Sequence, residues 1–125
     1  MLKNKLPKLQ FRDFDEYQKF CNKHAIYPAI GKKFIYALIG LSEEVGEISG
    51  KIKKVYRDEG GKITKLKKVE IVKEIGDAMF YVAQLCTDLN IKLSDIVSNN
   101  MEKLHIGKKN KKFMVAAIID ESIKI

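Results

Sequence analysis

The stretch KKFIYALIGLSEEVGEISGKIKKVYRD, residues 32–58, decides the fold of this chain. Its apolar side chains recur at steps of three and four, which is the period of one face of an α-helix. They are Phe34, Ile35, Leu38, Leu41, Val45, Ile48, Ile52 and Val55. No proline interrupts the stretch, and the pair Gly60-Gly61 follows it as a strong stop signal. The pattern predicts a long helix that ends near Asp58.

Three further stretches have the same helical period. One covers residues 66–89, with an apolar stripe of Val69, Val72, Ile75, Met79, Val82 and Leu85. A short one covers residues 15–24 and follows Asp13, a suitable N-cap residue. The last begins near Ser94. Four helices with short joins predict an all-α domain resembling a four-helix bundle.

Composition narrows the class of protein. A length of 125 residues fits one domain, and 46% apolar with 32% charged residues is typical of a globular chain. No apolar run is long enough to span a bilayer, and we read no secretion signal at the start. Cys21 and Cys86 do not make a disulfide framework, so we expect reduced thiols and a cytoplasmic location. The net charge of +8 favours polyanionic ligands, although scattered lysines also fit an ordinary solvated surface.

Two groups of carboxylates of the same form lie on the two longest predicted helices. Glu44-Val45-Gly46-Glu47 and Glu74-Ile75-Gly76-Asp77 each place two acids three residues apart, with an apolar residue and a glycine between them. Like charges at this spacing repel, and a glycine inside a helix costs up to about 1 kcal/mol relative to alanine. The apolar neighbours predict that the acids border a core-facing surface; these neighbours are Val45, Ile48, Ile75 and Met79. The two glycines predict a close approach of the helices there.

Four converging carboxylates would repel one another unless a cation neutralised them. Magnesium takes oxygen ligands and combines a few carboxylates with water and substrate phosphates. The two histidines, His24 and His105, supply only one Glu-x-x-His pair, Glu102-x-x-His105, whereas a di-iron bundle needs two. We therefore expect Mg²⁺, with Mn²⁺ as a possible substitute. The alternative is that the acids are solvated and pair with lysines such as Lys51 and Lys73.

The acid pattern also resembles a known family. Glu43-Glu44-x-x-Glu47, then 26 intervening residues, then Glu74-x-x-Asp77 is similar to the signature of the MazG-like all-α nucleoside triphosphate pyrophosphohydrolases. Further matching segments are Tyr27-Pro28, Leu38 to Glu47, residues 53–58 and Asn100-x-x-Lys103-Leu104. The resemblance extends from about Glu16 to Leu104 and implies a single MazG-like domain over residues 1–125. Its core would be about 14–108, followed by an atypical tail, 109–125, whose segment Phe113 to Ile119 is wholly apolar.

The resemblance implies a hydrolase that cleaves nucleoside triphosphates to monophosphate and pyrophosphate for nucleotide-pool housecleaning. It implies metal ligands at Glu44, Glu47, Glu74 and Asp77, and Glu43 as a catalytic residue that orients or deprotonates the attacking water. Metal would cancel charge on the phosphates, and polar side chains would hold the leaving pyrophosphate. The candidates for substrate binding are Lys54, Arg57, Asn100 and Lys103. The family also implies a homodimer or homotetramer.

Two other functions are compatible with the sequence. One is a non-catalytic basic helical module that binds nucleic acid or a protein partner through its lysines. The other is a nucleotide sensor with slow turnover. The two intact acid clusters favour the enzyme, so we do not expect nucleic acid or a membrane to be its partner. Aromatic residues near the acids could stack on a base or belong to the core or a subunit interface; they are Tyr36, Phe80 and Tyr81.

Overall fold

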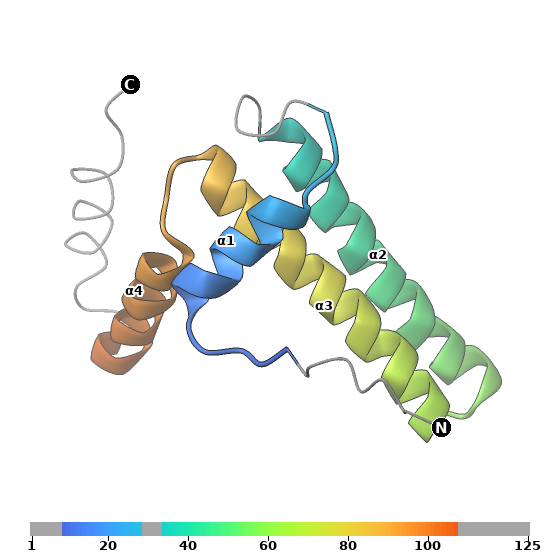
Figure 1. Cartoon of the computed structure of the whole chain (residues 1–125). Helices are drawn as coiled ribbons and strands as arrows, with labels where there is room; N and C mark the ends of the chain where they lie inside the picture. The colour runs from blue at the N-terminus through green and yellow to red at the C-terminus, as the bar shows by residue number, and fades with distance from the viewer. Residues whose placement is uncertain (1–8, 29–33, 108–125) are drawn as a thin grey trace, which may run out of the picture.

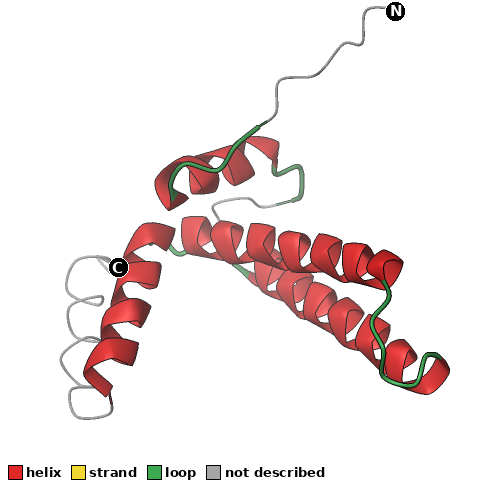
Figure 2. Cartoon of the chain, turned by 90° about the horizontal axis from the view of Figure 1, so that it is seen from below, coloured by secondary structure: helices red, strands yellow, loops and turns green. Residues whose placement is uncertain are grey.

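The computed structural model describes residues 9–28 and 34–107. They form α1 (Phe14–His24), α2 (Ile35–Asp58), α3 (Lys65–Asp88) and α4 (Leu93–Ile106), and the described residues contain no strand (Figure 2). The all-α prediction is confirmed, and the starts of α1, α3 and α4 lie one residue before the predicted ones. The first predicted residues of α2 and the apolar tail segment lie outside the described residues.

Helices α2 and α3 form a long antiparallel hairpin (Figure 1). At its turn Gly60 and Gly61 adopt positive φ angles of 61° and 79°, and the Gly61 amide donates to the Val55 carbonyl over 3.1 Å. Thr64 then caps α3 by accepting from the Lys67 amide at 3.1 Å. Both acid clusters lie about three helical turns from this connection, one on each arm. The hairpin therefore sets them opposite each other.

Helix α1 crosses α3 and braces the corner between α3 and α4 (Figure 1). Asp13 caps α1, as predicted, by accepting from the Glu16 amide at 2.7 Å. Gln18 donates to the Ile91 carbonyl at 2.9 Å and accepts from the Leu93 amide at 2.9 Å. Its side chain thus satisfies the first free amide of α4, which has no capping side chain of its own. No residues of α4 contact α2 in the described part of the chain.

The buried core is small. One cluster joins α1, α3 and α4 through Cys21, Ala83, Cys86 and Leu93, and both cysteines are free thiols. Ala37, Val55 and Ile71 are buried in the remainder of the described chain. None of the described helices has the length and apolar character needed to cross a membrane.

Most of the predicted apolar stripe on α2 and α3 is not buried among the described residues. Exposed fractions reach 50% for Val45, 57% for Val72 and 47% for Ile75. The expectation that the acids border a core-facing surface is therefore not met among the described residues, where α1 packs on α3 and α4 but not on α2, and α4 packs on α1 and the end of α3. The periodicity correctly located an apolar face, but it could not say what covers that face.

The close approach of the two helices is centred on a different glycine from the two predicted. Nothing in the described residues lies within 4 Å of where a Cβ would stand on Gly46 or Gly76, so the prediction of close packing there is wrong. A Cβ on Gly40 would instead overlap the ring of Tyr81. Gly40 is fully packed beneath that ring, one turn before the first acid cluster.

Candidate metal centre

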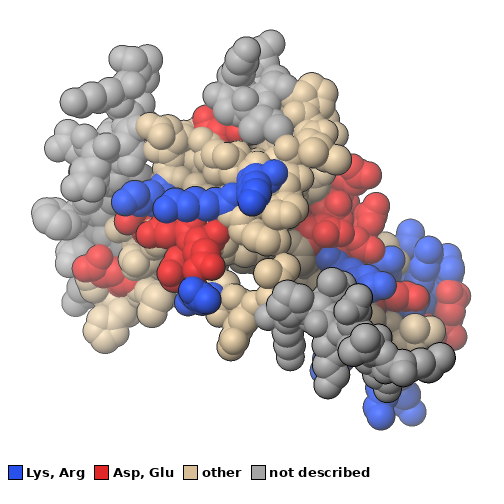
Figure 3. Space-filling view, viewed as in Figure 1, with Lys and Arg blue, Asp and Glu red and all other residues tan. Residues whose placement is uncertain are grey.

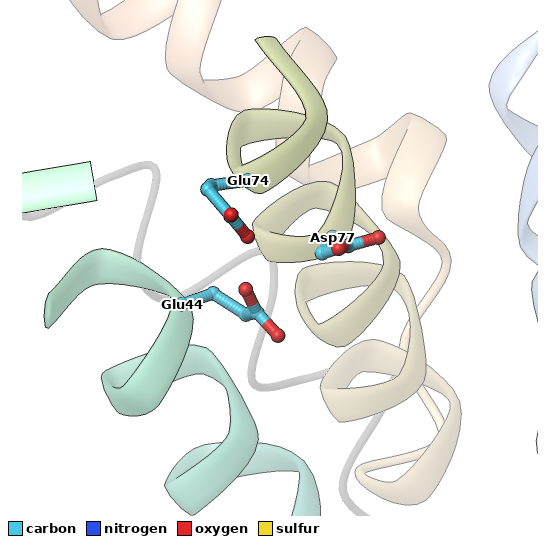
Figure 4. Close-up of side chains that lie close together, drawn as sticks. All are labelled: Glu44, Glu74 and Asp77. Atoms are coloured by element: carbon cyan, nitrogen blue, oxygen red, sulfur yellow. The ribbon is translucent and has the colours of Figure 1, made fainter. Parts of the chain in front are cut away.

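Three of the predicted ligands converge between the arms of the hairpin. Glu44 reaches from α2 toward Glu74 and Asp77 on α3 (Figure 4), and one carboxylate oxygen of each lies within 4.8 Å of the others. Glu44 and Glu74 are half-buried, whereas Asp77 is exposed. The i and i+3 spacing on α3 puts its two acids on one face, and the antiparallel arm brings Glu44 to that face.

Glu44 combines a raised pKa with a buried carboxylate oxygen. Burial, followed by the charges of Asp77 and Glu47, raises the pKa of Glu44 to about 7. Its Oε2 atom is buried and has no hydrogen-bond partner among the described residues. A buried carboxylate oxygen without a partner is costly, and a cation would satisfy it.

Glu47 and Lys51, one turn apart on α2, both contact Glu74. A hydrogen bond with Glu74 raises the pKa of the Glu47 carboxyl, so the fourth predicted ligand also lies against the group. Lys51 Nζ is 3.1 Å from Glu74 Oε1, and this contact is the main cause that lowers the pKa of Glu74. Pairing of acids with lysines therefore occurs at Lys51. Lys73 makes no such ion pair within the described chain.

These residues fit a hard divalent cation. All of the donors are carboxylate oxygens, and Glu44 Oε2 lacks a partner. Partial exposure leaves room for the water and phosphate oxygens that Mg²⁺ retains in its coordination shell. The set contains no sulfur or nitrogen donor, which disfavours zinc. Figure 3 shows acidic side chains gathered over the α2–α3 pair, with basic ones beside them toward the hairpin turn.

The structure places the remaining predicted site residues at different distances from the cluster. Glu43 is exposed, but its charge contributes to the raised pKa values of Glu47 and Tyr81, so it lies at the edge of the group. Lys54 and Arg57 are exposed on the last turns of α2. Arg57 forms a two-point contact with Asp58, with Nε 2.7 Å from one carboxylate oxygen.

Asn100 and Lys103 are exposed on α4. Because α4 contacts α1 and α3 but not α2 in the described residues, the single chain does not bring this pair to Glu44. Their role in substrate binding stays a prediction, as do the roles of the residues on α2.

Two of the aromatic residues expected near the acids, Tyr36 and Tyr81, form a group with Tyr27, whose part in it the sequence interpretation missed. Tyr27 and Tyr36 stack with ring centroids 4.5 Å apart, and Tyr27 accepts a hydrogen bond of 3.1 Å from the fully buried Gln84. Tyr81 lies one turn after Asp77, and burial raises the pKa of its hydroxyl. The sequence signal that could have revealed the partner of Tyr27 was Gln84, a single glutamine within the apolar stretch 78–86 of α3.

Comparison with known proteins gives the class of this chain. The model of the MazG nucleotide pyrophosphohydrolase domain matches residues 35–113, which contain both acid clusters. The chain therefore belongs to the MazG nucleotide pyrophosphohydrolase family. It is 39% identical over 99 residues to "Gene 37 protein" of Mycobacterium phage L5, an alignment that covers 75% of this chain and 87% of that protein. No solved structure shows a significant match.

Proposed function

We propose that this protein is a Mg²⁺-dependent nucleoside triphosphate pyrophosphohydrolase that converts (d)NTP to (d)NMP and pyrophosphate. The observation that carries the proposal is the convergence of Glu44, Glu74 and Asp77 in a chain of this family, with one buried oxygen of Glu44 left without a partner. Mn²⁺ would serve as a substitute, because it accepts the same oxygen ligands.

The acids would then share two tasks, metal binding and activation of water. Glu44, Glu47, Glu74 and Asp77 would hold the metal, which neutralises phosphate charge and activates water when bound. Glu43 is free of that coordination at the exposed edge of the group, so it would orient the attacking water or accept its proton. Because the acids lie on two packed helices, α2 and α3, their positions relative to one another would be fixed.

Basic and polar side chains would hold the polyphosphate. Lys54 and Arg57 project from α2 beyond the acids and offer positive charge to the leaving pyrophosphate. Asn100 and Lys103 lie on α4, away from α2. We assign them to a site completed by a second copy of the chain, in which α4 of one copy approaches the hairpin of another.

The uncovered apolar stripe supports such an assembly. Leu38, Val45 and Ile52 recur every seven residues on α2, and each is more than one third exposed. Contiguous exposed apolar surface on a helix usually marks a contact with another chain. We propose that the protein forms a homodimer or homotetramer. We also propose a cytoplasmic location, because two free thiols suit a reducing compartment.

The test is pyrophosphate release from a panel of canonical and modified nucleoside triphosphates, with and without Mg²⁺. Glu44→Gln and Asp77→Asn should abolish release, and Glu102→Gln, an exposed acid on α4, should leave it intact. Tight nucleotide binding without turnover would favour a sensor. Absence of both release and nucleotide binding in folded protein would refute the proposed function in favour of a basic binding module.

A further inference from the structure

Lys51 holds a partly shielded ion pair with one of the proposed metal ligands. Its ammonium lies 3.1 Å from Glu74 Oε1, and the two side chains are only 27% and 15% exposed. Lys51 follows Glu47 by four residues on α2, so both side chains lie on the helix face that meets α3. The pair therefore bridges the two arms of the hairpin at the acid cluster.

No other cation in the described residues forms an ion pair with a proposed metal ligand. The other ion pairs there join Arg57 to Asp58 and Lys67 to Glu70, both within one helix. In the part of the chain that the structure describes, several carboxylates thus surround one paired ammonium group. In the absence of metal, Lys51 is the main charge that offsets repulsion between the arms.

A metal ion and Lys51 would compete for the same carboxylate. A bound hard cation would take a Glu74 oxygen as a ligand, and the positive charge of Lys51 beside that carboxylate would oppose its binding. For Glu74 to face the metal fully, its contact with Lys51 must loosen. The ammonium group would then be available at the rim of the site.

We infer that Lys51 is an internal counter-ion of the acid cluster, which stabilises the metal-free hairpin and competes with the metal for Glu74. This inference rests on the proposed function, because it takes the same residues as ligands. Lys51 is a positioning residue in this scheme, since it acts on the metal through Glu74.

The experiment measures Mn²⁺ binding by calorimetry and melting temperature in EDTA for Lys51→Met and Lys53→Met. Lys53 is an exposed lysine on the same helix with no ion pair in the described chain, so it is the matched control. Lys51→Met should bind Mn²⁺ about fivefold more tightly than the native protein, equivalent to about 1 kcal/mol. It should melt at a lower temperature in EDTA, whereas Lys53→Met should match the native protein in both measurements.

A second cycle separates the ion pair from general damage to the fold. Lys51→Arg keeps the charge and should retain native metal affinity. In a Glu74→Gln background, Lys51→Met should lower the melting temperature in EDTA less than in the native background, because the nearest partner charge is gone while Glu47 and Glu70 remain. An equal loss of stability in both backgrounds would overturn the inference.

The outcomes also distinguish this inference from the proposed function. A native protein that binds Mn²⁺ and hydrolyses triphosphates, with Lys51→Met binding no more tightly than Lys53→Met, would overturn the counter-ion role alone. A native protein that binds no Mn²⁺ would overturn both.

Discussion

Metal affinity should fall about tenfold between pH 8 and pH 6, because a proton and the metal compete for Glu44. Burial and the neighbouring charges of Asp77 and Glu47 raise the pKa of Glu44 to about 7. A group with that pKa is about 90% ionised at pH 8 and about 10% ionised at pH 6. Only the ionised form binds a cation, so the ratio of these fractions gives the expected loss.

The assay is calorimetric titration of Mn²⁺ into the protein at half-unit pH steps, at constant ionic strength. Native protein should show affinity rising through pH 7 and levelling near pH 8, with about one proton released per metal at pH 6. Glu44→Gln should bind more weakly and show a flatter profile. Glu102→Gln should reproduce the native profile. A native affinity that is constant from pH 6 to pH 8 would refute the assignment of Glu44 as a metal ligand with a raised pKa.

Three further predictions concern stability, measured by thermal or urea unfolding. In EDTA the protein should lose stability as pH rises from about 4.5 to about 7. The folded-state pKa of Glu44, about 7, lies above its ordinary value of 4.5, so this carboxyl favours the fold only while it is protonated. A melting temperature that rises over this pH range would contradict the burial of that carboxyl. Gly40→Ala should cost about 1–3 kcal/mol, since the new methyl overlaps the Tyr81 ring. Gly46→Ala has open space and should be neutral or stabilising by about 0.5–1 kcal/mol in the single chain, so equal losses at both glycines would argue against the packing described. Gln18→Ala should cost about 1–3 kcal/mol, because it leaves the Leu93 amide and Ile91 carbonyl without their partner; an unchanged urea midpoint would show that α1 does not brace α4.

The helices and their ends were predictable because local signals decide them. The apolar period located α2 and α3, and Gly60-Gly61 supplied the positive φ angles that the turn requires. The convergence of Glu44 with Glu74 followed from the same hairpin, since two arms of similar length bring equivalent positions together.

The packing between helices was not predictable in the same way. A glycine in a helix shows where a close approach is possible, and only the relative rotation of two helices decides whether Gly40 or Gly46 receives a neighbour. An apolar stripe likewise gives no sign of whether its cover comes from the same chain. Lys51 was recognised as a potential partner of the acids, but its reach across to α3 depends on the register of the hairpin.

The two proposed ligand clusters lie on either side of one turn, with 26 residues between Glu47 and Glu74. A metal held by both arms would therefore be a cross-link that closes a loop of about 30 residues, the kind of constraint that removes entropy chiefly from the open chain. The protection against hydrogen exchange should be limited to the two helices that hold the metal. Amide hydrogens of α2 and α3 should exchange more slowly when metal is added, while those of α4 keep their rates. A single bound ion would then divide the molecule into a cross-linked hairpin and an end that it leaves unconstrained.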